Sequence, residues 1–232
     1  MPANFVTPTH SEETLKSKPA KPPFGYYGAK QKISRQIIDL LPPHNAWVEG
    51  FCGSAALTLA KEPVPIEVIN DLDDEIINVF RQLRENSKAL CEMIALTPYA
   101  KEEFELARSS EKSNDPLERA RRFLVSTMMA VNATVGSTTC GFSFSQSYSR
   151  QGREARVSRW YNLPERLEKV VERLRGIRIE KRDARQLLEM FSDRPATLIY
   201  LDPPYFTKRD HGYVIDAKDE ELHIDMLKGC QR

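Results

Sequence analysis

The chain has 232 residues, of which 41% are hydrophobic, and this is enough for one large domain with a packed core. Its formal net charge is only +1, so any surface for nucleic acid must be local. No apolar run predicts a membrane span, and the N-terminus lacks the order of a secretory signal. The scattered cysteines form no CxxC pair, which favours reduced thiols in a cytoplasmic protein over a metal site or a disulfide framework. They are Cys52, Cys91, Cys140 and Cys230.

The first part of the chain predicts an extension followed by alternating strands and helices. Residues 1–23 are polar and have no apolar period, which predicts a disordered N-terminal extension. From Phe24 onward, apolar spacing predicts five elements in turn. These are a helix over Lys32–Leu41, a strand over Ala46–Glu49, a helix over Ala55–Lys61, a strand over Ile66–Ile69 and a helix over Asp74–Arg84. Such alternation predicts a parallel α/β sheet.

The middle of the chain interrupts this alternation. Helical spacing continues over Glu102–Leu106 and Leu117–Val131. Asn132–Arg159 has no period and is rich in serine, glycine, aromatic residues and arginine, so we expect an insertion of loops and short hairpins. The sequence then predicts a helix over Leu163–Leu174, a strand over Ile177–Ile179 and a strongly apolar strand over Thr197–Leu201.

Asp202, Pro203, Pro204 and Tyr205 follow this last strand directly. In α/β sheets, ligands and chemistry lie at the carboxyl ends of the strands. The Asp202 carboxylate and the Pro203 carbonyl can accept hydrogen bonds from the two protons of an amino group, which favours the pyramidal nitrogen that attacks an electrophile. The prolines stiffen the loop, and Tyr205 offers a ring face to an extruded base. The alternative is an ordinary strand end, at which Asp202 only caps a turn.

Other motifs precede these residues in order. The segment from Tyr26 to Lys30 (YYGAK) comes first, then Glu49–Ser54 (EGFCGS), then Asn70–Asp73 (NDLD). Together with the irregular insertion and the Asp-Pro-Pro-Tyr motif, this order resembles the Dam-type (D12 class) N6-adenine DNA methyltransferases, over roughly Phe24 to Tyr205. Gly50 departs from that family, in which proline is usual at this position. The resemblance implies a Rossmann-like sheet that uses S-adenosyl-L-methionine to methylate N6 of an adenine flipped out of double-stranded DNA.

The resemblance also divides the chain. Residues 24–96 would form the cofactor-binding part, residues 97–165 the target-recognition insertion, and residues 166–232 the return to the methyltransferase domain. The family's sheet continues well past the Asp-Pro-Pro-Tyr motif, whereas only a helix over Glu220–Leu227 is predicted here. We therefore expect the C-terminal strands to be missing, the catalytic strand to have an unpaired side, and the chain to be a fragment, a split-gene half or a degenerate remnant.

The resemblance assigns catalysis to Asp202, Pro203, Pro204 and Tyr205. It assigns cofactor contacts to residues of several motifs, namely Tyr26, Lys30, Glu49, Phe51, Gly53, Ser54, Asp71, Asp183 and Asp202. Gly53 and Ser54 would let the backbone approach the cofactor, and Asp71 can accept hydrogen bonds from both ribose hydroxyls. The alternatives are an ordinary βα turn, a solvated Lys30, Asp73 or Asp74 as the ribose acid or as a helix cap, and Asp183 as the cap of the following helix.

The insertion interleaves aromatic and basic residues, which suits phosphate contacts combined with base stacking. The residues expected to bind DNA are Phe142, Arg150, Arg153, Arg156 and Arg159. The alternative is a solvated, arginine-rich loop or one face of a helix.

Three functions remain open: adenine-N6 DNA methylation, a related amino-methylation such as that of cytosine N4, and DNA binding without catalysis. Asp202 argues against the second, because N4-cytosine enzymes usually carry serine and protein-glutamine enzymes asparagine at this position. The resemblance leaves open whether a restriction endonuclease or a separate C-terminal half acts as a partner.

Overall fold

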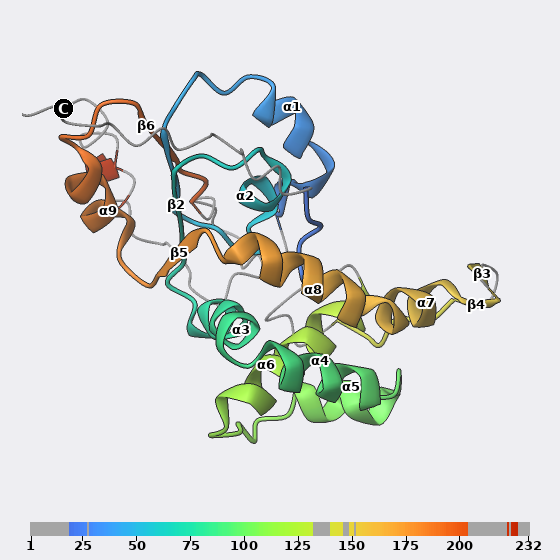
Figure 1. Cartoon of the computed structure of the whole chain (residues 1–232). Helices are drawn as coiled ribbons and strands as arrows, with labels where there is room; N and C mark the ends of the chain where they lie inside the picture. The colour runs from blue at the N-terminus through green and yellow to red at the C-terminus, as the bar shows by residue number, and fades with distance from the viewer. Residues whose placement is uncertain are drawn as a thin grey trace, which may run out of the picture.

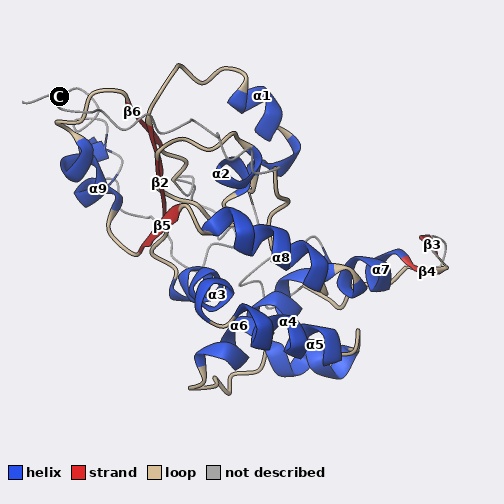
Figure 2. Cartoon of the chain, in the orientation of Figure 1, coloured by secondary structure: helices blue, strands red, loops and turns tan. Residues whose placement is uncertain are grey.

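The computed structural model describes residues 19–26, 28–131, 140–145, 149–150, 152–203, 222 and 224–226. The predicted disorder of residues 1–18 and two residues of the catalytic motif, Pro204 and Tyr205, lie outside this part. Within it, the chain forms a parallel sheet with helices on both faces and a further group of helices to one side (Figures 1 and 2). No helix in these ranges is long and apolar enough to cross a bilayer.

The sheet has the order β5-β2-β1-β6, and all three strand pairings are parallel. Its strands are β1 (Ala46–Glu49), β2 (Ile66–Asn70), β5 (Ile177–Glu180) and β6 (Thr197–Tyr200). The four strands predicted from the sequence are thus confirmed to within one residue at each end. Among the described residues, none pairs with the outer side of β6, so the strand that precedes Asp202 lies at the edge of this sheet.

The two faces of the sheet are covered by different helices, because successive side chains of a strand point to opposite faces. Val48 of β1 packs with Leu187 and Phe191 of α9 (Ala184–Phe191). Trp47 points the other way, is fully buried, and donates from Nε1 to the hydroxyl of Thr58 in α2 (Ala56–Ala60) at 2.7 Å. α8 (Leu163–Leu174) joins α2 on that second face through Arg173, whose Nη2 donates to the Thr58 carbonyl at 3.0 Å.

The remaining long helices form a second layer that shares one hydrophobic core with α8. They are α3 (Asp74–Glu85), α4 (Ser87–Leu96), α5 (Lys101–Ala107) and α6 (Pro116–Met128). Phe24 lies within this core, fully buried, with its ring centre 5.0 Å from that of Phe123 and 6.0 Å from that of Phe80. Beyond α7 (Ala155–Tyr161), the short hairpin of β3 (Ser149–Arg150) and β4 (Arg153–Glu154) lies at the far tip of the molecule in Figure 1.

Several expectations from the sequence are corrected by the structure. Residues 19–23 are not disordered, because Ala20 is buried and its N–H donates to the Leu59 carbonyl at 2.9 Å. The expected helix over Lys32–Leu41 is instead a 3-10 turn, η1 (Lys30–Lys32), followed by the short α1 (Ser34–Ile38). α4 was not predicted. The insertion contains the expected hairpin, but Ala155–Tyr161 is helical rather than a loop.

Three charged side chains are buried between β2, α2 and α8. Glu67 Oε1 accepts from Lys61 Nζ at 3.0 Å and from Arg173 Nη2 at 2.8 Å, and Glu67 Oε2 pairs with Arg173 Nη1. Each of the three residues is at most 4% exposed. The two cations share one carboxylate, so Glu67 supplies the counter-charge that offsets the desolvation cost of both.

We predict that Glu67→Gln destabilises the fold by about 3–5 kcal/mol, because it leaves two buried cations without a counter-charge. Urea unfolding at neutral pH measures this. Glu172→Gln is the matched control, since Glu172 is exposed and pairs with exposed Arg175 on α8, and it should change stability by less than about 1 kcal/mol. Equal losses in the two variants would show that the buried cluster is not what holds these elements together.

Candidate active site

The carboxyl ends of the parallel strands meet at one edge of the sheet. Glu49 at the end of β1 is in register with Tyr200 of β6 and Ile69 of β2, and Asn70 is in register with Glu180 of β5. Three of the motifs that carry the resemblance begin where a strand ends. Glu49–Ser54 begins at the end of β1, Asn70–Asp73 at the end of β2, and the Asp-Pro-Pro-Tyr motif follows β6. The fold therefore brings together residues that lie far apart in the sequence.

Gly53 allows the backbone conformation of the turn after β1. This residue has φ +49°, a backbone conformation that glycine adopts easily and other residues resist. A Cβ at this position would lie 2.9 Å from the ring of Tyr26, so the ring packs directly against the turn. The first motif and the second motif are thus in contact, as a shared binding site requires.

Asp71 fixes this turn from the end of β2. Its Oδ2 accepts from the Gly53 N–H at 2.9 Å, and its Oδ1 accepts from the Asp73 N–H at 3.0 Å. Burial raises the pKa of Asp71 to about 6, and these backbone hydrogen bonds act in the opposite direction. Each oxygen retains a lone pair, so the carboxylate can accept further hydrogen bonds.

Asp73 and Asp74, the two other acids near the end of β2, make different interactions. Asp73 caps α3 by accepting from the Glu75 N–H at 2.9 Å, as the alternative interpretation predicted. Asp74 pairs with Lys181 at 2.6 Å and Arg119 at 2.8 Å, and these hydrogen bonds lower its pKa to about 2. Asp71 therefore remains available to a ligand at the sheet edge, whereas Asp73 has one oxygen occupied by the helix cap and Asp74 is ion-paired.

Asp202 pairs with Lys30 on the other side of the edge. Lys30 Nζ donates to Asp202 Oδ2 and also to the Gly28 carbonyl at 3.0 Å. Both side chains are partly exposed, at 18% for Lys30 and 25% for Asp202. The sequence predicted a functional role for each residue but not that they contact one another.

Glu49 points away from the edge and into the protein. Its Oε2 accepts from both the backbone N–H of Thr58, at 3.1 Å, and the Thr58 hydroxyl. Burial raises its pKa to about 7, and the neighbouring charge of Asp202 acts in the same direction. In this structure Glu49 anchors α2 to β1, and the cofactor contact predicted for it remains a prediction.

Asn70 was missed by sequence reasoning. Its buried amide donates to the carbonyls of Gly50 and Arg182, both at 2.9 Å, and accepts from the Arg182 N–H at 2.8 Å. It thereby ties the segment after β1 to the segment after β5. The sequence does contain a feature that indicates this role, because Asn70 is an amide at the last position of an apolar strand. A polar side chain buried at such a position needs hydrogen-bond partners.

Asp183 follows β5 and caps α9, which is the alternative that the sequence left open. Its Oδ1 accepts from the Arg185 N–H at 2.9 Å, and its Oδ2 pairs with the Arg185 guanidinium at 2.7 Å. These hydrogen bonds lower the pKa of Asp183. The other predicted cofactor residues lie in the turn after β1, where Phe51 is half-buried and Ser54 is buried.

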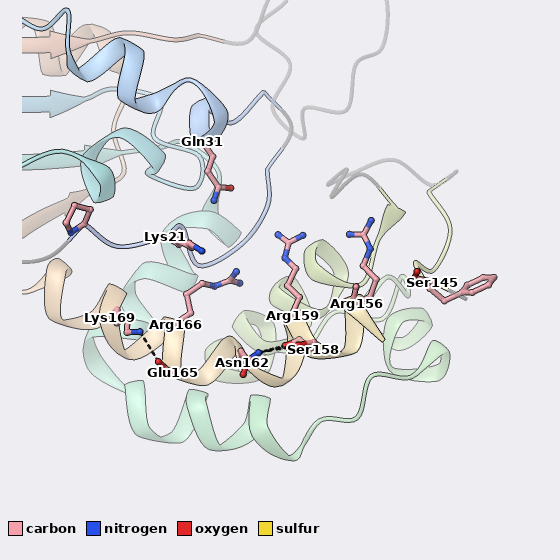
Figure 3. A pocket seen from close by; sticks show the side chains of 13 residues that line it. Lys21, Gln31, Ser145, Arg156, Ser158, Arg159, Asn162, Glu165, Arg166 and Lys169 are labelled. Atoms are coloured by element: carbon pink, nitrogen blue, oxygen red, sulfur yellow. Dashed lines mark hydrogen bonds and ion pairs between the residues drawn. The ribbon is translucent and has the colours of Figure 1, made fainter. Parts of the chain in front are cut away.

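The residues predicted to bind DNA separate into two groups. Arg156 and Arg159 line a groove of about 1280 Å³ between α7, α8 and the segment that begins at Pro19 (Figure 3). Arg153 instead stacks its guanidinium over the ring of Tyr161, 3.9 Å from its centre. The side chain of Arg150 lies outside the described residues.

Phe142 packs against the helical layer. Its ring centre lies 5.1 Å from that of Tyr99 and 5.8 Å from that of Phe104, and it is partly buried. An aromatic ring gains from such packing, and the DNA contact predicted for Phe142 remains a prediction. In the described ranges, no cluster of three or more potential metal ligands occurs.

We predict that Glu49→Gln changes the pH dependence of stability. The folded pKa of about 7 exceeds the unfolded value of 4.5, so the contribution of Glu49 is fully present below pH 4.5 and is lost as the pH rises through 7. The lost free energy is on the order of 3 kcal/mol. Urea unfolding between pH 4.5 and 8 should show a flatter profile for the variant. Parallel profiles for the two proteins would contradict this prediction.

Comparison with known proteins agrees with the motifs. The pattern of the D12 class N6 adenine-specific DNA methyltransferases matches residues 26–232. The Type II methyltransferase M1.LlaDCHI of Lactococcus lactis subsp. cremoris is 27% identical over 188 residues. That match covers 77% of this chain but 63% of the relative, so the chain spans less than two thirds of the relative's length. Since the family match includes every motif at the sheet edge, the chain belongs to the D12 class N6 adenine-specific DNA methyltransferase family.

Proposed function

We propose that this chain transfers a methyl group from S-adenosyl-L-methionine to N6 of adenine in DNA. The observation that carries the proposal is the position of Asp202. It follows β6 at the carboxyl edge of the sheet, pairs with Lys30, and shares that edge with the turn that joins Gly53 to Asp71. Family membership supplies the class of reaction, and the geometry supplies an acceptor for the target amine beside a turn suited to the cofactor.

The residues of this turn fit S-adenosyl-L-methionine. Asp71 can accept hydrogen bonds from ribose hydroxyls with its remaining lone pairs. Among the described residues, Asp73 Oδ2 is buried and has no hydrogen-bond partner, so a polar ligand can donate a hydrogen bond to it. The Tyr26 ring packed on Gly53 forms an apolar wall beside these carboxylates. We also keep in this proposal the other residues that the resemblance assigns to the cofactor, which are Lys30, Glu49, Phe51, Ser54 and Asp183.

When bound, S-adenosyl-L-methionine supplies an electrophilic methyl group. Asp202 Oδ2 is held by Lys30, and none of the described residues forms a hydrogen bond with Oδ1. In the proposed mechanism that oxygen accepts a hydrogen bond from one N6–H of the target adenine and the Pro203 carbonyl accepts a hydrogen bond from the other, which favours the pyramidal nitrogen that develops during attack. Lys30 orients the carboxylate and connects it, through the Gly28 carbonyl, to the first motif. Pro204 and Tyr205 keep their predicted roles in this site.

The basic groove supports DNA as the substrate. Its lining includes Lys21, Arg156, Arg159, Arg166 and Lys169, and a single acid, Glu165, which pairs with Lys169 at 2.8 Å. The net charge of the chain is only +1, so this concentration of positive charge is local, as a phosphate-binding surface on such a protein must be. Arg150, Arg153, Arg156 and Arg159 remain the proposed contacts of the insertion.

We predict that Asp202→Asn lowers methyl transfer by at least about 100-fold, the scale on which loss of one preorganised polar group acts. The carboxylate that accepts a hydrogen bond from the amine is replaced by an amide of the same shape, so affinity for S-adenosyl-L-methionine should change only modestly. Transfer of tritiated methyl groups to unmethylated DNA measures turnover, and calorimetry measures affinity. Full turnover in the variant would remove Asp202 from the mechanism, and no transfer by the parent chain would contradict the proposed activity.

We predict that replacing Arg150, Arg153, Arg156 and Arg159 with glutamine weakens binding to duplex DNA and flattens its salt dependence. Each lost phosphate contact should reduce the slope of log affinity against log salt by about 0.9. Binding of S-adenosyl-L-methionine should persist, because the insertion lies away from the sheet edge. If these arginines only solvate the insertion, the slope of the folded variant will equal that of the parent.

A further inference from the structure

Three arginines in the groove stand out because their charges are not balanced. Arg156 and Arg159 lie on one face of α7, three residues apart, and Arg166 follows on α8 (Figure 3). Across the described residues, no carboxylate forms an ion pair with any of the three. The acid in the groove, Glu165, is paired with Lys169 instead.

Other arginines of the protein provide an internal comparison. Several arginines that lie against the helical layer or the sheet are matched with carboxylates. They are Arg119 with Asp74 and Glu75, Arg121 with Glu103 and Glu118, Arg122 with Glu118, Arg173 with Glu67, and Arg185 with Asp183 and Asp225. The three arginines of the groove differ from this set, because their charge can be matched by an anion from outside.

Arg166 is held in place although its charge is unmatched. Its Nη2 donates to the Pro23 carbonyl at 2.9 Å and contacts Met128 Sδ at 3.4 Å, while its Nε is buried without a partner among the described residues. Burial lowers its pKa to about 10, and the charge of Arg159 adds to this effect. Burial also lowers the pKa of Arg159, to which Arg156 contributes. The hydrogen bond to Pro23 thus fixes Arg166, and the repulsion between the two guanidinium groups has a cost in free energy that a bound anion would offset.

We infer that Arg159 and Arg166 form a site for one phosphate group of the DNA backbone, with residues 19–23 as its wall. The inference rests on the proposed DNA substrate and adds a residue outside the predicted contacts. Two guanidinium groups directed at one phosphate give short, charge-assisted hydrogen bonds. The groove is far larger than a single anion, and Lys21, Arg156 and Lys169 extend its positive charge, which fits a polyanionic strand rather than a small ion.

The test measures the salt dependence of duplex DNA binding for Arg159→Gln, Arg166→Gln and the double variant, using the whole chain. Each single variant should weaken binding roughly tenfold, as loss of one charge-assisted hydrogen bond does. The double variant should lower the log–log salt slope by about 0.9, the value for one phosphate. A decrease near 1.8, the value for two phosphates, would overturn the shared site, and so would an unchanged slope.

Arg175→Gln is the matched control, because Arg175 is an exposed arginine directly after α8 that pairs with Glu172, and the salt slope of this variant should equal the parent's. Arg159 makes no hydrogen bond with the described residues, so Arg159→Gln tests the site even if Arg166→Gln fails to fold. Arg166→Lys keeps the charge and should retain the parent slope, whereas a purely structural role for Arg166 predicts a lower melting temperature with DNA binding intact. A parent chain without DNA binding would contradict the proposed substrate itself, which distinguishes that failure from failure of the phosphate site.

Discussion

The arrangement of the site depends on two adjacent side chains at the end of β2. A parallel sheet aligns the ends of its strands, but it does not determine where the following segments go. Asn70 bridges the segment after β1 and the segment after β5 through three hydrogen bonds to backbone groups. Asp71 holds the turn at Gly53 and the start of α3 through two more. These hydrogen bonds satisfy backbone groups that the sheet leaves unpaired, and in exchange a carboxylate is partly desolvated, which raises its pKa to about 6. The same desolvation makes Asp71 a strong acceptor for a ligand that excludes water.

The parts of this arrangement that the sequence predicts are those encoded locally. β1 and β6 are short apolar runs that end in special residues, and their positions follow from that pattern. Asp73 as a helix cap also follows, because capping involves neighbours two or three residues away. The pair formed by Lys30 and Asp202 does not follow, since it joins residues 172 positions apart and depends on the strand order. The packing of Phe142 against the helical layer does not follow either, for a related reason. Its surroundings in the sequence are polar and irregular, but the rings of Tyr99 and Phe104 pack against it in space.

Charge is separated between the two proposed sites. Four acids, Glu49, Asp71, Asp73 and Asp202, lie at or near the carboxyl edge of the sheet, and burial raises the pKa of the first three. Basic residues line the groove between α7 and α8. The net charge near zero is therefore the sum of two regions of opposite charge. The acidic region suits a cofactor with ribose hydroxyls and a cationic centre, and the basic region suits a phosphate backbone. The composition of the whole chain cannot reveal this separation, because it sums over both surfaces.

A single short segment, residues 19–26, touches both sites. Ala20 binds the end of α2 through the Leu59 carbonyl, Pro23 accepts a hydrogen bond from Arg166 in the groove, and Tyr26 packs on Gly53 at the sheet edge. Phe24, between these contacts, is fully buried in the core that the sheet shares with the helical layer. The segment has no regular secondary structure, so its position is fixed by these contacts rather than by a hydrogen-bonded ladder. Its position determines at once the wall of the proposed cofactor site and the wall of the proposed phosphate site.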